Sequence, residues 1–242
     1  MESAAPLISA TRSIVVAADV GSLEEFERQV VQTAAGTGVG AYKIGLSLVL
    51  RYGLGCVVRT ARAHTDRPLI YDHQKGGTDI PQMAPNFAAV CRSAGVDAVI
   101  LFPLSGPETA RRWIAASQEV GLRVLVGGHM THKAFLHSEG GFVIDSAPRA
   151  ILELASDMGV VDFVVPGNKI ALIDEAKQLL EKKGVRYTFY APGFITQGGD
   201  ITECARAAGE RWHAIVGSAI YSAPNPQEAV AQLSRLLTQG GK

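Results

Sequence analysis

Eight short apolar runs alternate with longer amphipathic stretches along this chain of 242 residues, and this alternation constrains the fold more than any other feature. Each run is only a few residues long and apolar at nearly every position, which is typical of parallel strands buried on both faces. The predicted strands are Ser13–Ala18, Ala41–Gly45, Leu69–Tyr71, Ala98–Phe102, Val124–Val126, Phe163–Val165, Tyr187–Tyr190 and Ala214–Val216.

Between these runs lie stretches with the spacing of amphipathic helices. The first begins with Ser22, and Glu25 follows three residues later, which is the spacing of a capping box. Helices are predicted over Ser22–Ala35, Pro107–Val120, Ala147–Met158, Ile170–Lys183, Ile201–Ala208 and Pro226–Thr238.

The alternation of strands and helices predicts a parallel α/β fold. A closed (β/α)₈ barrel, or TIM barrel, is favoured over an open doubly wound sheet. There are eight strand candidates, the length suits one barrel, and no Gly-x-Gly-x-x-Gly follows the first strand. We therefore expect a single domain over residues 1–242, with frayed ends at 1–10 and 239–242.

Composition argues against several classes of protein. Lys+Arg and Asp+Glu number 23 each, and a formal net charge of zero argues against nucleic acid as a partner. No apolar run is long enough for a membrane helix, and Met1–Ala10 does not resemble a secretory signal. The three cysteines form no Cys-x-x-Cys pair. We expect a cytoplasmic protein with reduced cysteines.

Five charged residues stand at or just after the ends of the first three predicted strands. Active sites of such barrels lie there, and charges at an apolar barrel mouth are costly unless paired, so we expect one network. A lysine between aspartates stays protonated, which suits it to stabilise a carbanion and then donate a proton. The alternative is an ion-pair network that only closes the barrel mouth. The five residues are Asp19, Lys43, Asp72, Lys75 and Asp79.

Glycine-rich loops follow the seventh and eighth predicted strands. The first contains Pro192-Gly193 and Gln197-Gly198-Gly199, and the second contains Gly217-Ser218. Loops at this pair of strands often hold a phosphate through backbone N–H groups, so they predict a phosphate site. Ordinary turn formation is the alternative explanation of these glycines.

The loop after the fifth strand contains three histidines, His129, His132 and His137. Their spacing could serve zinc, but no acidic or cysteine partner stands in a ligand pattern. We therefore predict no metal site and interpret these histidines as loop residues near the substrate.

With these motifs in place, the chain resembles the orotidine 5′-phosphate decarboxylase family from Val15 to Leu237. The Asp…Lys…Asp-Ile-Pro element and the Pro-Gly…Gln-Gly-Gly-Asp element together form a specific pair. The segments that carry the resemblance are Ala18-Asp19, Tyr42–Gly45, Asp72–Pro81, Ala191–Gly193, Gln197–Asp200, Ile215–Gly217 and Ile220-Tyr221.

The resemblance implies a homodimer without cofactor or metal that converts orotidine 5′-monophosphate (OMP) to UMP in pyrimidine synthesis. It implies that Asp72, Lys75 and Asp79 form the catalytic array, that Lys43 links the charges, and that Asp79 reaches a neighbouring subunit's site. Loss of CO₂ leaves a carbanion at C6 with no adjacent electron sink, so a cofactor-free enzyme has to stabilise it electrostatically.

The resemblance also assigns substrate contacts. Asp19 is similar to a residue that holds the ribose hydroxyls, and Thr131 to a hydroxyl that contacts the pyrimidine. Pro192 and Gln197 match residues near the base and the phosphate. The backbone of Gly198, Gly199, Gly217 and Ser218 is then expected to hold the phosphate.

Three departures from the family pattern stand out. Lys75 follows Asp72 by three residues and Asp79 follows Lys75 by four, where the family usually has two and three. Ser218 stands where the family usually has a phosphate-binding arginine, and Met83 replaces a small hydroxyl residue.

Two other functions remain open from the sequence. One is a Mg²⁺-dependent sugar-phosphate lyase of the 3-keto-gulonate-phosphate decarboxylase or hexulose-phosphate synthase type. Gly45–Leu48 lacks the metal-binding glutamate which that class normally carries there. The other is a non-catalytic barrel that binds a phosphate ligand, which Ser218 suggests and the intact Asp72, Lys75 and Asp79 set argues against.

Overall fold

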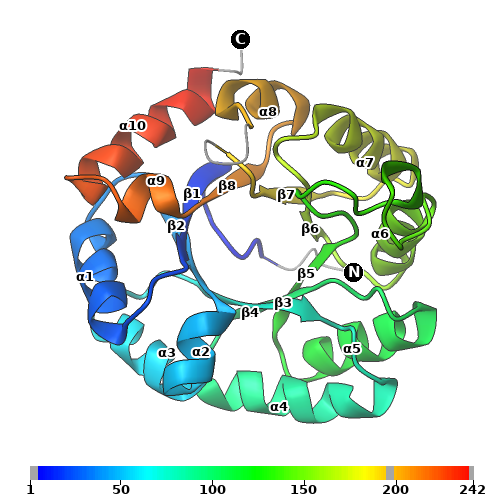
Figure 1. Ribbon diagram of the computed structural model, residues 1–242, viewed down its shortest axis with the longest axis horizontal. Coiled ribbons are helices and arrows are strands. Elements are labelled where there is room, and N and C mark those ends of the chain that lie inside the picture. Colours follow the sequence, from blue (N-terminus) through cyan, green and yellow to red (C-terminus); the bar gives the residue numbers. More distant parts are fainter. Residues whose placement is uncertain (1–4, 195–198, 240–242) are drawn as a thin grey trace.

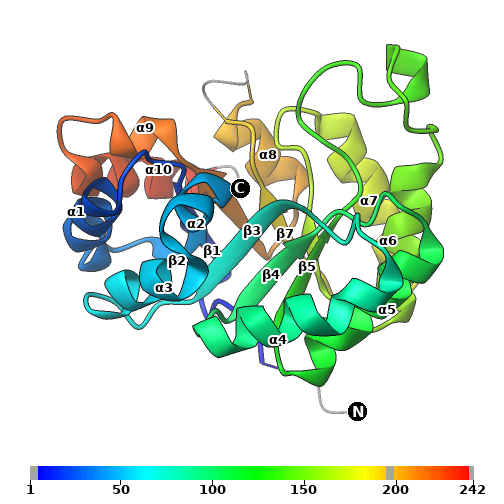
Figure 2. The ribbon, with the colours of Figure 1, turned by 60° about the horizontal axis from the view of Figure 1, so that its bottom comes forward.

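Eight parallel strands close into a barrel in the order β1 to β8, as the sequence predicts, in this computed structural model. The structure describes residues 5–194 and 199–239, without the side chains of Gln74, Lys75, Thr238 and Gln239. Helices surround the barrel (Figure 1 and Figure 2). The strands are β1 (Arg12–Ala18), β2 (Val39–Ile44), β3 (Leu69–Gly76), β4 (Ala98–Leu101), β5 (Arg123–Gly127), β6 (Asp162–Val164), β7 (Thr188–Ala191) and β8 (Trp212–Val216).

The helices follow the strands in the order that a (β/α)₈ barrel requires. Ser22 and Glu25 form the predicted capping box at the start of α1. The predicted list omitted the helices between β2 and β3 and between β3 and β4. The α-helices are α1 (Leu23–Ala34), α2 (Leu46–Tyr52), α3 (Leu54–Arg62), α4 (Ala84–Ala94), α5 (Pro107–Glu119), α6 (Ala147–Asp157), α7 (Ile170–Lys182), α8 (Ile201–Ala207), α9 (Ser218–Tyr221) and α10 (Pro226–Gln239). Two 3₁₀ turns are η1 (Pro81–Met83) and η2 (His137–Glu139).

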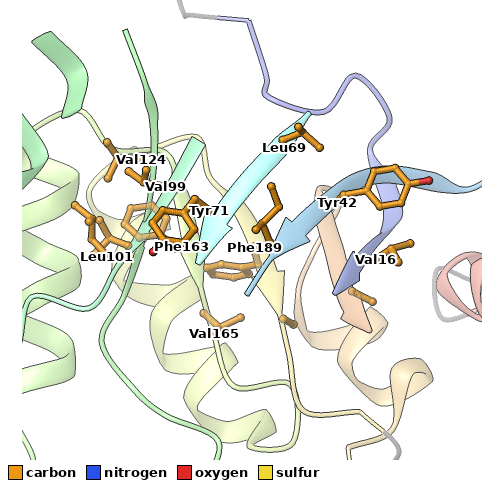
Figure 3. Packing of buried hydrophobic residues seen from close by; sticks show 14 of the residues in the cluster. Val16, Tyr42, Leu69, Tyr71, Val99, Leu101, Val124, Phe163, Val165 and Phe189 are labelled. Carbon is orange, nitrogen blue, oxygen red and sulfur yellow. The ribbon is translucent and has the colours of Figure 1, made fainter. Parts of the chain in front are cut away.

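Two apolar layers hold the barrel together because side chains alternate along each strand. The outer layer fills the space between strands and helices and includes Val16, Tyr42 and Phe163 (Figure 3). The inner layer fills the barrel and includes Val15 and Ile70. On β3, Ile70 and Asp72 therefore point into the barrel.

The N-terminal segment crosses one opening of the barrel (Figure 1). Part of the segment that the sequence predicts to fray packs against the barrel. Ile8 is buried, and the Arg211 guanidinium donates hydrogen bonds to the carbonyls of Ile8 and Ala10, each at 3.0 Å. Burial of this apolar side chain and the two hydrogen bonds offset the entropy cost of ordering the segment. Residues 1–4 and 240–242 lie outside the described residues.

At the amino-terminal end of the barrel interior, His213 is fully buried and its Nδ1 lies 2.7 Å from the Ser13 hydroxyl. Burial, reinforced by nearby Arg211, lowers the pKa of His213 to about 3. In the unfolded chain the imidazole regains a pKa of about 6.5 and binds a proton below that pH. As the pH falls from 6.5 toward 3, His213 therefore binds a proton in the unfolded state but not in the folded state.

This difference predicts a loss of stability in acid. We expect the free energy of unfolding to fall by roughly 3 kcal/mol between pH 6.5 and pH 4 through this one residue. In His213→Leu the contribution should be absent, whereas Ser13→Ala, which keeps the imidazole, should retain it. Urea unfolding at the two pH values measures the effect. Equal pH dependence in wild type and His213→Leu would contradict the assignment.

Candidate active site

A cavity of about 320 Å³ opens at the carboxyl ends of the strands, which is the end where barrels of this type place their sites. Seven of the predicted site residues line it. They are Asp19, Lys43, Asp72, Thr131, Pro192, Gly217 and Ser218. The volume is within the range of small-molecule pockets, which start near ~300 Å³.

Lys43 forms the centre of the charged network in this cavity. Its ammonium lies 3.0 Å from Oδ2 of Asp72 and 3.3 Å from Oδ1 of Asp19. The side chains of Lys43 and Asp72 are 6% and 12% exposed, whereas that of Asp19 is 50% exposed. Asp19 can therefore meet a ligand from the open side of the cavity, while Lys43 and Asp72 lie deeper.

Burial and charge act in opposite directions on Lys43. Burial alone would lower the pKa of its ammonium, but the neighbouring carboxylates of Asp72 and Asp19 outweigh burial and leave the pKa raised. Lys43 is therefore a permanent cation near neutral pH. It joins Asp19 on the β1–α1 connection and Asp72 on β3 across strand β2.

Gly45 makes room for the Asp19 carboxylate at the start of α2. A Cβ at Gly45 would overlap Oδ1 of Asp19. Gly45, the last residue of the Tyr42–Gly45 segment, therefore has a steric role, because any side chain there would push the Asp19 carboxylate away from Lys43.

Strand β3 contains a bulge where the sequence departs from the usual spacing. Asp72 pairs with Ile100 of β4, and the next paired residue of β3 is Gly76, which lies opposite Leu101. Three residues of β3, including Lys75, thus stand between two consecutive positions of β4. Bulges of this kind change the direction of a side chain and occur next to active sites. The backbone of Lys75 lies in the bulge, and its side chain lies outside the described residues.

Two aromatic residues hold this segment from the helix side of the barrel. The Tyr71 hydroxyl lies 2.6 Å from Nδ1 of His73, at the start of the bulge. The indole N–H of Trp113, on α5, donates a hydrogen bond to the carbonyl of Ile80 at 3.2 Å. Burial lowers the pKa of His73, with Asp72 opposing the change, so the imidazole is neutral near neutral pH. Trp113 is buried, as a residue of the core would be, and no local sequence pattern indicates its hydrogen bond to Ile80.

The structure does not bring Asp79 to the cavity of its own chain. Its Oδ1 accepts a hydrogen bond from the backbone N–H of Ile80 at 2.7 Å, and the residue is exposed. The cavity lining does not include it.

The predicted phosphate loops are described only in part. Gln197 and Gly198 lie outside the described residues. The N–H of Gly199 donates to the carbonyl of Gly193 at 3.1 Å and so closes the base of the β7–α8 loop. Gly217 and Ser218 line the cavity where α9 begins.

Sequence reasoning missed most of the apolar wall of the cavity. This wall contains Ile100, Phe102, Met130, Val164 and Ile215. Ile100, Val164 and Ile215 have the sequence pattern of ordinary strand residues. The pattern does not show whether an inward side chain lies at the cavity or deeper inside the barrel.

His129 is a buried part of the cavity wall. Its Nδ1 lies 2.7 Å from the carbonyl of Met130, so this nitrogen carries the proton, and burial lowers the pKa of the ring. Among the described residues there is no group of three or more His, Cys, Asp or Glu side chains that could hold a metal ion. The described part of the chain also contains no helix of the length and apolarity that crossing a membrane requires.

A sequence profile of the Orotidine 5'-phosphate decarboxylase / HUMPS family matches residues 12–233. The chain belongs to this family. Among its relatives, the orotidine 5'-phosphate decarboxylase of Methanosarcina mazei is 30% identical over 81% of this chain and 82% of its own length. That of Methanosarcina barkeri is 28% identical over 91% of this chain and 92% of its own length.

Solved structures of family members share the fold. Orotidine 5'-monophosphate decarboxylase of Methanocaldococcus jannaschii, complexed with the inhibitor BMP, has a TM-score of 0.81 at 22% identity and covers 95% of this chain and 100% of its own. The enzyme of Pyrococcus horikoshii has a TM-score of 0.75 at 26% identity, with 93% and 99% covered. Family membership confirms the resemblance stated from the sequence motifs.

Proposed function

We propose that this chain decarboxylates OMP to UMP in pyrimidine synthesis. The observation that carries the proposal is the Lys43 ammonium held between Asp19 and Asp72 in the barrel mouth, with Lys75 on the same strand as Asp72. The two Methanosarcina relatives named above are orotidine 5'-phosphate decarboxylases, and this chain matches each of them along most of its length. This similarity supports the same substrate.

The proposed reaction needs no electron sink outside the protein. The bond from C6 to the carboxylate breaks, CO₂ leaves, and the electron pair stays on C6. The Lys75 ammonium stabilises this carbanion and then gives it a proton, after which solvent reprotonates the amine. Asp72 lies beside Lys43 and would face the carboxylate that leaves, which disfavours the bound substrate relative to the transition state.

The remaining residues are assigned to binding. Asp19, half-exposed, would accept hydrogen bonds from the ribose hydroxyls. Thr131 and Pro192 line the cavity and would contact the pyrimidine. Gly217 and Ser218 would meet the phosphate through backbone N–H groups.

Three further residues complete the proposed phosphate loop. Gln197 and Gly198 are assigned to it by the family motif, and both lie outside the described residues. Gly199 shapes the loop through its bond to Gly193.

The first test is turnover after removal of divalent metals. We expect purified protein to convert OMP to UMP with unchanged kcat in EDTA, because the two acidic side chains described in the cavity, Asp19 and Asp72, are bound to Lys43. The fall in OMP absorbance measures the reaction. Loss of activity in EDTA with recovery in Mg²⁺ would instead favour the sugar-phosphate lyase function. UMP binding without OMP turnover would favour the non-catalytic barrel.

A homodimer is the second part of the proposal. Asp79 is exposed, and two apolar side chains near it in sequence are exposed as well. Ile80 is 58% exposed and Met83 is 41% exposed in the single chain. A neighbouring subunit that packs on Ile80 and Met83 would receive Asp79 in its own site.

The dimer predicts a linked loss of assembly and activity. We expect light scattering to give twice the mass of one chain, and Ile80→Glu to shift the protein toward monomer with reduced kcat. Val90→Glu, an exposed apolar position on α4, serves as the matched control for the added charge. A fully active wild-type monomer would contradict this part of the proposal.

A further inference from the structure

Phe102 occupies the space that a side chain of Gly127 would fill. Phe102 follows β4 and Gly127 ends the neighbouring strand β5. A Cβ built on Gly127 would overlap the Phe102 ring at three of its carbon atoms. Phe102 is 7% exposed and lines the cavity, whereas Gly127 does not line it. The glycine therefore sets where the ring can lie.

The backbone of Phe102 is also coupled to the β3 bulge. Its N–H donates a hydrogen bond to the carbonyl of Gly76, the residue after Lys75, at 2.6 Å. The ring belongs to the inner apolar layer with Ile100 and Val164, and Met130 packs against that layer. Phe102 thus places a planar aromatic ring in the cavity wall. It directly follows Leu101, the β4 residue that pairs with Gly76 of β3.

We propose that the Phe102 ring is the stacking wall for the pyrimidine base and that Gly127 determines its position. This inference rests on the proposed function, because it takes the ligand to be a pyrimidine nucleotide. Stacking of a base on an aromatic side chain favours a flat ring with a π face and gives little to a puckered, saturated ring. Phe102 is therefore a specificity-determining residue, and Gly127 acts through it as a positioning residue.

The test compares two ligands that differ only in the planarity of the base, UMP and 5,6-dihydro-UMP. Calorimetry on the full chain should show that wild type binds UMP roughly 10-fold more tightly than the saturated analogue. Phe102→Leu should reduce this preference to about twofold or less, and Phe102→Tyr should restore it, because the ring returns. Ribose 5-phosphate, which has no base, should bind all three proteins alike.

Gly127→Ala provides the second, independent variant. Its methyl group would displace the ring without touching the cavity, so the preference for UMP should fall as in Phe102→Leu. In the Phe102→Leu background the same substitution should change UMP affinity by less than about twofold, because the ring it displaces is gone. Thermal unfolding of each variant checks that the fold is kept.

The outcomes separate the two proposals. If wild type binds UMP and Phe102→Leu keeps the full preference for the planar base, Phe102 is not the stacking wall. The same holds if Gly127→Ala weakens UMP equally with and without the ring. If wild type does not bind UMP at millimolar concentration, the proposed function itself is contradicted. The proposal that Phe102 stacks on a pyrimidine base is then contradicted as well.

Discussion

Replacing Lys75 by alanine is expected to lower kcat for OMP by roughly 10⁴-fold or more while the protein stays folded. Two effects are lost together in this variant. The ammonium no longer stabilises the carbanion, and no positioned acid supplies the proton, and each role is typically worth about 10²-fold or more. Because the backbone of Lys75 lies in the bulge of β3, where the ladder with β4 is interrupted, we expect its truncation to leave the free energy of unfolding nearly unchanged.

The distribution of the loss between kcat and KM identifies the role of Lys75. An interaction made only in the transition state lowers kcat and kcat/KM together and leaves UMP affinity almost unchanged. Lys75→Arg keeps the charge but not the geometry or the acidity, so it should also be nearly inactive. Lys182→Ala, which removes an exposed lysine from α7, is the matched control. If Lys75→Ala retains more than about a hundredth of the wild-type kcat, Lys75 does not act in the chemical step.

The barrel and the position of its charged mouth could be predicted from the sequence because both depend on short-range patterns. Strands buried on both faces are apolar at every position, and the residue after the last apolar position must lie at the barrel mouth. Asp19 and Asp72 were placed in this way, Lys43 was placed within the second predicted strand, and the three side chains meet in the structure. The position of each depends only on the limits of its own strand.

The bulge of β3 and the position of the Phe102 ring could not be predicted in the same way. The sequence shows that the segment from Asp72 to Asp79 is longer than usual, but not whether the extra residues enter the strand or the following loop. That choice depends on pairing with β4, where Gly76 rather than Lys75 lies opposite Leu101. Phe102 likewise depends on the absence of a side chain at Gly127, 25 residues later in the chain.

The predicted segment of residues 1–10 illustrates a third limit. Its composition is that of a frayed end, yet Ile8 enters the barrel opening and its carbonyl receives a hydrogen bond from Arg211. The partner stands more than 200 residues away in sequence, so no local pattern reveals it. The pairing of Ser13 with His213 is hidden for the same reason.

The second large effect is expected from Lys43→Met, which should reduce both activity and stability. The Lys43 ammonium neutralises Asp72, whose side chain is only 12% exposed. Without the ammonium, Asp72 remains as a buried carboxylate next to an apolar methionine. Removing one member of a buried ion pair typically costs about 3–5 kcal/mol, and the half-exposed Asp19 should add little because water can solvate it. Activity should fall as well, because Asp72 would lose the ammonium that lies 3.0 Å from its carboxylate.

A matched double variant separates charge from packing. Asp72→Asn in the Lys43→Met background removes the carboxylate charge, so stability should recover by most of the loss while activity stays absent. Urea unfolding of wild type and both variants at pH 7 measures the effect. A double variant no more stable than Lys43→Met would mean that Lys43 stabilises the barrel by packing and not by neutralising Asp72.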